Sequence, residues 1–152
     1  MANNGYAIEC RGITKTFGTV VANDGVDLTV RYGEVLALLG ENGSGKTTLM
    51  NMLSGIYHPD AGTIKIAGQE VSISSPEDAM ALGIGMIHQH FKLVDVFTAA
   101  ENIAVGTPGK RLSARVMREK VCQISRSIGL DIDPDRRAFE MSVSEKQTVE
   151  IL

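Results

Sequence analysis

The segment that decides the fold reads Gly40-Glu41-Asn42-Gly43-Ser44-Gly45-Lys46-Thr47-Thr48. It fits the pattern G-x-x-x-x-G-K-[ST] at every fixed position. Glycines at positions 43 and 45 let the chain curl so that successive backbone N–H groups point inward, where they can bind phosphate oxygens. The segment therefore predicts a loop that holds the phosphates of a nucleotide.

Charge adds to this loop in two ways. Lys46 supplies a point charge for the β and γ phosphates, and the Thr47 hydroxyl can ligate Mg²⁺. The helix expected to begin near Lys46 directs its positive dipole end at the same place. We therefore expect nucleotide binding by Gly40, Asn42, Gly43, Ser44, Gly45, Lys46, Thr47 and Thr48.

The surroundings of the loop fit the same prediction. Residues 35–39 are continuously apolar, as in a strand buried on both faces of a parallel sheet, and a helix is expected over residues 46–54. Residues 6–30 alternate loosely between glycines and predict short antiparallel strands, and a further strand is expected over residues 63–67.

Downstream, helix signals come to dominate. Ser75 followed by Pro76 predicts a helix start, and residues 84–87 predict a return strand. Beyond about residue 90 the chain reads as helical. Capping boxes are expected at Thr98 with Glu101 and at Ser142 with Glu145. An amphipathic stripe is expected from Met117, Val121, Ile124 and Ile128.

Composition excludes several classes of protein. The chain has 152 residues and a net charge of −3, which argues against a generic polyanion-binding surface, and it has no Trp to stack on single-stranded nucleic acid. Cys10 and Cys122 are far apart and are expected to be free thiols in a reducing compartment. The longest purely apolar run is five residues, so any membrane crossing is expected in another polypeptide.

Two further segments resemble those of one family. The run from Ile13 to Gly18, ahead of the phosphate loop, resembles the start of an ABC-transporter nucleotide-binding domain, which implies that Phe17 stacks on adenine. The run from Ile84 to Phe91 resembles the family's Q-loop, which implies that the Gln89 amide oxygen ligates Mg²⁺ and that the loop passes motion to a transmembrane partner. From its sequence alone, Phe17 could equally be a core residue.

The family's signature motif, Leu-Ser-Gly-Gly-Gln, is expected where Ser142 to Gln147 stand. The resemblance implies that Ser142, Ser144 and Glu145 bind the γ-phosphate held by the loop of another subunit. Val143 and Ser144 replace both glycines of the motif, which puts the catalytic competence of that half-site in doubt. An ordinary helix cap explains Ser142 equally well, and both readings can hold together.

The resemblance implies an α/β fold: a P-loop NTPase of ABC type, with a mixed sheet, an N-terminal antiparallel β-subdomain and a helical subdomain, incomplete at the C-terminus. Residues 1–90 would form the nucleotide-binding core and residues 91–152 the helical subdomain. The family's Walker B Asp, catalytic Glu and switch His cannot be located, so we expect a fragment with little ATPase activity of its own. The strand over residues 35–39 would then have an unpaired apolar edge that invites aggregation.

The function implied is that of an ATP-binding subunit of an ABC importer of a sugar or nucleoside, with ATP and Mg²⁺ as cofactors and Lys46 and Gln89 in catalytic roles. A second nucleotide-binding domain in a head-to-tail dimer and transmembrane permease subunits would be the partners. The subunit would lie in the cytoplasm, peripheral on the inner face of the cell membrane.

Two alternatives stay open. One is a non-catalytic nucleotide-binding module. The other is a soluble ABC-type protein acting on nucleic acid or the ribosome, supported only by the eight basic and four acidic residues between positions 110 and 137. No nucleic acid is expected as a partner, and the transported substrate cannot be read from these residues.

Overall fold

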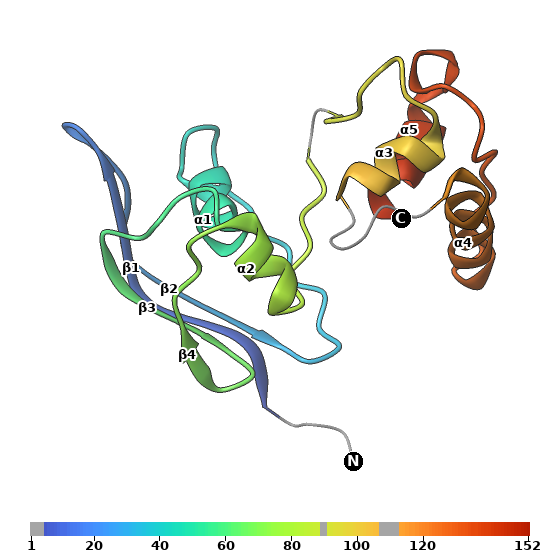
Figure 1. Ribbon diagram of the computed structural model, residues 1–152. Helices are drawn as coiled ribbons and strands as arrows, with labels where there is room; N and C mark the ends of the chain where they lie inside the picture. Colours follow the sequence, from blue (N-terminus) through green and yellow to red (C-terminus); the bar gives the residue numbers. More distant parts are fainter. Residues whose placement is uncertain (1–4, 89–90, 107–112) are drawn as a thin grey trace. The chain divides into compact units, whose positions relative to one another are not determined.

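A computed structural model describes residues 5–88, 91–106 and 113–152 (Figure 1). The chain divides into two compact units, Met1–Met86 and Ile87–Leu152, and each is described by itself. The first unit combines a sheet with two helices, and the second is helical.

The sheet of the first unit has four strands in the order β2-β1-β3-β4, and all neighbours are antiparallel. The strands are β1 (Tyr6–Phe17), β2 (Val20–Arg31), β3 (Ala61–Ile66) and β4 (Gln69–Val71). The antiparallel strands expected near the N-terminus are confirmed, but they are two long strands rather than several short ones. Irregularities in the β1–β2 register near Gly12 and Gly25 absorb the expected breaks without ending either strand.

One face of this sheet is covered by two helices, α1 (Lys46–Leu53) and α2 (Pro76–Ala81), as Figure 1 shows. Burial raises the pKa of the Cys10 thiol to about 11, so this group stays neutral and packs as an apolar side chain. Ser75 caps α2 as expected, since its hydroxyl accepts a hydrogen bond from the Asp78 N–H at 3.2 Å. The core between sheet and helices is made by Cys10, Ile13, Leu49, Met52, Leu53, Ile64, Ile73 and Ala79.

Two expected strands are not formed. Residues 35–39 and 84–87 have no strand conformation, and Val35 and Leu39 are 99% and 92% exposed. The prediction of a buried strand was wrong because a strand needs a hydrogen-bonded neighbour, and no described residue pairs with either segment. Within the described residues the sheet is therefore antiparallel, without the parallel part that a mixed sheet requires.

The second unit contains α3 (Ala99–Gly106), α4 (Ala114–Ser127), the 3₁₀ helix η1 (Ala138–Glu140) and α5 (Val143–Ile151). The expected capping box at α3 is confirmed: the Glu101 N–H donates to the Thr98 hydroxyl at 3.2 Å, and the Thr98 N–H donates to the Glu101 carboxylate at 2.9 Å. The core of this unit is made by Ala99, Ala100, Val121, Ile132, Ala138, Met141 and Val149.

The apolar stripe of α4 differs from the prediction. Met117 and Val121 pack into the core as expected, but Ile124 is 44% exposed and Ile128, just past the helix, is 50% exposed. The buried line instead follows the i, i+4 spacing from Val121 to Ser125, which is only 2% exposed and donates its hydroxyl to the Cys122 carbonyl at 3.2 Å.

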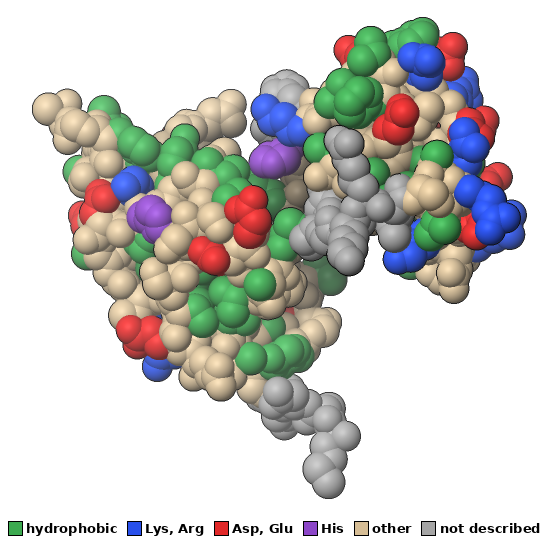
Figure 2. All heavy atoms as spheres, viewed as in Figure 1, with side chains coloured by type: hydrophobic (Ala, Val, Ile, Leu, Met, Phe, Trp, Pro, Cys, Tyr) green, Lys and Arg blue, Asp and Glu red, His purple; other side chains and the backbone are tan. Residues whose placement is uncertain are grey.

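Basic and acidic side chains alternate over the visible surface of the second unit (Figure 2). Ion pairs join Arg115 to Glu119, Arg118 to Asp135 and Arg136 to Glu145. Part of the positive charge between positions 110 and 137 is thus neutralised locally, as on a solvated helical face. No helix among the described residues is long and apolar enough to cross a membrane.

Candidate functional site

The glycine-rich loop lies directly before α1 and requires glycine at two positions. Gly43 and Gly45 have φ angles of 85° and 83°, in the left-handed region that residues with a Cβ rarely adopt. Gly45 is the N-cap of α1, and its carbonyl accepts the N–H of Leu49 at 2.9 Å. The two glycines therefore set the curl of the loop and the point at which the helix begins.

Gly45 also approaches β2 closely. A Cβ at this position would lie 2.2 Å from the Ala22 carbonyl oxygen and 2.9 Å from Asn23 Nδ2. No side chain fits that space without movement of the strand backbone. By contrast, a Cβ on Gly43 would meet nothing within 4 Å. The loop is thus held against the sheet at Gly45 and is open at Gly43.

The Lys46 ammonium lies inside the curl of the loop. It donates hydrogen bonds to the carbonyl oxygens of Gly40 at 2.8 Å and Glu41 at 2.7 Å, and to the Ser44 hydroxyl at 3.1 Å. These three acceptors match the three donors of an ammonium group. The charge is therefore placed where a phosphate in the loop would meet it, and phosphate oxygens would compete with the two carbonyls.

The N-terminus of α1 has no internal anion. No side chain caps it, and no acidic residue stands in its first turn. The helix dipole and the first N–H groups are therefore available to a bound anion. Thr47 and Thr48 lie in this first turn, with Thr47 exposed, and Asn42 is exposed in the loop. The structure thus brings together all eight loop residues expected from the sequence.

Asn23 is a residue of this site that the sequence did not reveal. It is only 6% exposed, and its Nδ2 donates a long hydrogen bond of 3.4 Å to the Gly45 carbonyl. Its Oδ1 is buried with no hydrogen-bond partner among the described residues. The one available signal was a polar amide in the strand ahead of the loop, and no local spacing relates position 23 to position 45.

Phe17 ends β1 and is 44% exposed, so it is not a core residue. Its ring contacts that of Tyr57, with centroids 5.2 Å apart and planes at 70°. Lys15 Nζ lies 5.6 Å from the Phe17 centroid. The ring therefore sits at the protein surface with part of its area open to a ligand.

The expected signature segment opens α5 in the second unit. The Ser142 hydroxyl accepts the Glu145 N–H at 3.3 Å, and the Glu145 carboxylate accepts the Ser142 N–H at 2.8 Å, which completes a capping box. Glu145 also pairs with Arg136. Hydrogen bonds from the Ser142 backbone and hydroxyl, aided by Arg136, hold the pKa of the Glu145 carboxyl below its usual range. Val143 is 66% exposed and Ser144 is also exposed.

Gln89, together with the neighbouring His90, lies outside the described residues. Elsewhere in the described chain, no group of three or more His, Cys, Asp or Glu residues could hold a metal ion by itself.

Comparison with known proteins gives three results. Residues 23–152 match the family model described as ABC transporter. Guanosine import ATP-binding protein NupO of Bacillus subtilis is 49% identical over 97% of this chain and 29% of its own length. Nucleoside import ATP-binding protein NupA of Lactococcus lactis is 47% identical over 100% of this chain and 30% of its own length.

Ribose import ATP-binding protein RbsA 1 of Streptomyces avermitilis is 44% identical over 99% of this chain and 30% of its own length. The chain thus spans about 30% of the length of the curated relatives it matches. A solved structure described as a nucleotide-free ATP-binding cassette from an ABC transporter aligns with a TM-score of 0.80 and 26% identity, over 97% of this chain and 63% of that one. The ADP conformation of the cassette MJ1267 aligns over the same shares with a TM-score of 0.78 and 27% identity.

Proposed function

This chain belongs to the ABC transporter family, and on that premise we propose that it is part of an ATP-binding subunit that powers import of a nucleoside or sugar. The observation that carries the proposal is the geometry of the loop around Lys46. The backbone curls around the Lys46 ammonium, and the helix that follows begins without a side-chain cap or an acidic residue in its first turn. The nucleoside and ribose import proteins that match the chain support the class of transported substrate.

In this proposal the backbone N–H groups of the loop bind the β and γ phosphates of ATP. Lys46 exchanges its contacts with the Gly40 and Glu41 carbonyls for phosphate oxygens, which places a positive charge on the phosphates. Mg²⁺ would add positive charge there, and the Thr47 hydroxyl and the Gln89 amide oxygen would ligate it. Phe17 would stack on the adenine.

The partners and location follow from the same premise. We expect a second nucleotide-binding domain, whose phosphate loop would face Ser142, Ser144 and Glu145 of this chain across a head-to-tail dimer. Transmembrane permease subunits would carry the substrate, and the subunit would lie on the cytoplasmic face of the membrane. Residues 1–90 would form the nucleotide-binding core and residues 91–152 the helical subdomain with the signature segment.

The test is nucleotide binding by the full 152-residue chain, measured by calorimetry with ATP and Mg²⁺. We expect Lys46→Ala to weaken ATP binding about tenfold or more, because a charge-assisted contact to phosphate is worth about 1.5–3 kcal/mol. Lys120→Ala, which removes an exposed lysine of α4, is the matched control and should bind ATP like the parent chain. The proposal fails if the parent chain does not bind ATP, or if Lys46→Ala binds it equally well.

A further inference from the structure

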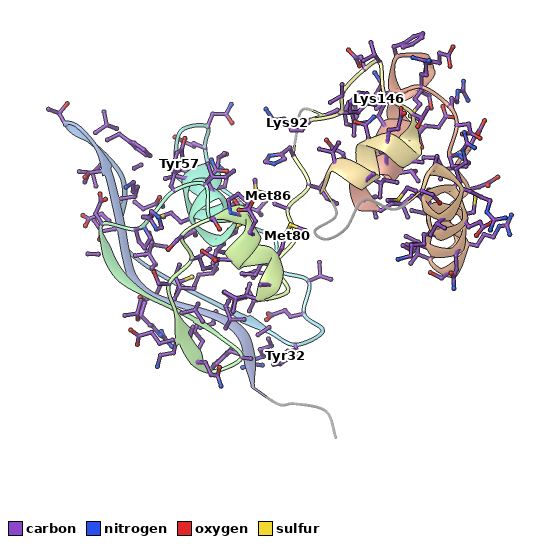
Figure 3. The ribbon with its side chains drawn as sticks, viewed as in Figure 1. Tyr32, Tyr57, Met80, Met86, Lys92 and Lys146 are labelled. Carbon is purple, nitrogen blue, oxygen red and sulfur yellow. The ribbon has the colours of Figure 1, made fainter. Side chains whose placement is uncertain are left out.

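Phe17 belongs to a four-residue cluster that joins two segments distant in the sequence. Phe17 and Lys15 lie on β1, whereas Tyr57 and Asp60 lie in the segment between α1 and β3 (Figure 3 labels Tyr57). The backbone N–H of Tyr57 donates to the Asn51 carbonyl of α1 at 3.1 Å. The aromatic partner of Phe17 is thus fixed to the helix that begins at the phosphate loop.

Asp60 fastens its segment to β1. One carboxylate oxygen accepts from Lys15 Nζ at 2.7 Å, and the other accepts from the Thr16 N–H at 2.7 Å and the Thr16 hydroxyl at 2.8 Å. The Asp60 N–H donates to the Thr14 carbonyl at 2.8 Å. These hydrogen bonds lower the pKa of Asp60 to about 2, so the carboxylate stays charged near neutral pH.

The ion pair with Asp60 also holds the Lys15 ammonium beside the Phe17 ring. The Lys15 side chain is 15% exposed, and its Nζ is held 5.6 Å from the Phe17 centroid while it is bonded to Asp60. Phe17 is therefore fixed by Tyr57 at 5.2 Å and by a cation, yet 44% of it remains exposed. A surface aromatic that is already immobilised loses little conformational entropy when a ligand stacks on it.

We propose that Tyr57 and the Lys15–Asp60 ion pair are positioning residues that hold the Phe17 ring for stacking on the nucleobase. The inference rests on the proposed function, because it assigns residues to the base end of the same nucleotide. It goes beyond that function in that nothing in the phosphate loop requires Tyr57 or Asp60. The cluster would therefore affect binding of the base and leave binding of the phosphates unchanged.

The test compares ATP with inorganic tripolyphosphate, which has the phosphates and no base, as ligands of the full chain in calorimetry. We expect Tyr57→Leu and Asp60→Asn each to weaken ATP binding about fivefold, the order of one aromatic contact. Binding of tripolyphosphate should change less than twofold. Tyr57→Phe keeps the ring contact and should bind ATP like the parent chain, which separates positioning from a loss of folding.

The matched control is Tyr6→Leu. Tyr6 is also an exposed aromatic of β1 beside a cation, with Arg31 Cζ 5.8 Å from its ring centroid, and it should bind both ligands normally when replaced. The inference is overturned if Tyr57→Leu weakens both ligands equally, or weakens neither. If the parent chain binds ATP no better than tripolyphosphate, the base platform is wrong while the phosphate site stands. If it binds neither ligand, the proposed function fails as well.

Discussion

The starts of α1 and α5 are chemically opposite. At α1 the N-cap is Gly45, no side chain caps the helix, and its first turn has no acid. At α5 the N-cap is Ser142, and the Glu145 carboxylate fills the capping box and pairs with Arg136. Both positions were expected from the sequence to meet phosphate, but only the start of α1 lacks an anion of its own.

This difference assigns the two helix starts different tasks. The α1 start lies beside the Lys46 ammonium and has no anion of its own, so a bound anion would stabilise it. The α5 start is already satisfied, so a phosphate there would have to share its N–H groups with the Glu145 carboxylate and overcome like-charge repulsion. The role of Ser142 as a helix cap therefore accounts for the contacts that the structure shows at this residue. Binding of a partner's γ-phosphate by Ser142 is a proposal.

The largest effect is expected from Gly45→Ala. The new Cβ would meet the Ala22 carbonyl oxygen at 2.2 Å and would occupy a φ of 83°, so we expect a loss of about 3 kcal/mol in unfolding free energy and of ATP binding. Gly43→Ala has the same backbone strain without the contact and should lose about 1 kcal/mol. Urea unfolding measures both. Equal losses for the two variants would mean that close approach to β2 does not fix the loop.

A smaller effect is expected from Ser142→Ala. Loss of the cap at α5 should cost about 1 kcal/mol of unfolding free energy, because the Glu145 N–H loses its acceptor. ATP binding by the single chain should be unchanged, since this segment serves its own helix. Urea unfolding and calorimetry measure the two quantities. A weakened ATP affinity with unchanged stability would contradict the capping interpretation.

Acidification should destabilise the first turn of α5, which depends on the Glu145 carboxylate, and leave the first turn of α1 unchanged, because that turn has no acidic residue. The pKa of Glu145 is lowered in the folded chain, so its stabilisation is fully present above the unfolded value of 4.5 and is lost as the pH falls below it. Hydrogen exchange of the first-turn amides, followed from pH 6 to pH 3, measures this loss. Glu145→Gln should remove the pH dependence at α5. The interpretation is wrong if α5 amides in the variant show the parent's pH dependence.

The smallest effect on stability is expected just before the loop, at Leu39→Asp. Leu39 is 92% exposed, so its replacement should change the unfolding free energy by less than about 0.5 kcal/mol. It should reduce self-association, because it places a charge in an exposed apolar run. Sedimentation at increasing concentration measures this. A large loss of stability would show that residues 35–39 are buried in solution after all.

The sequence predicted the features that depend on local chemistry. The glycine positions of the loop and the caps at Ser75, Thr98 and Ser142 follow from backbone sterics and short-range hydrogen bonds. It failed where the outcome depends on distant neighbours. The apolar run at residues 35–39 is typical of a buried strand, but burial also needs adjacent strands.

The same limit applies to the site. Asn23 contacts Gly45 of the loop across 22 residues of sequence, and Tyr57 contacts Phe17 across 40 residues. No pattern in the sequence predicts contacts between residues so far apart. The apolar stripe predicted for α4 differs from the buried face of that helix for a similar reason. The face that α4 buries is set by its neighbours in the second unit, and these lie far away in the sequence. Local motifs thus located the phosphate loop, and only the fold revealed what holds it.

The central claim is that, within a single chain, ATP binds at the loop before α1, whereas the start of α5 is occupied by its own capping box. Its most direct test is an NMR titration of the ¹⁵N-labelled full chain with ATP and Mg²⁺, following the backbone amides of both helix starts. The account predicts large shifts at residues 40–48 and little change at residues 142–145. Shifts centred on residues 142–145, or no shift at residues 40–48, would contradict it.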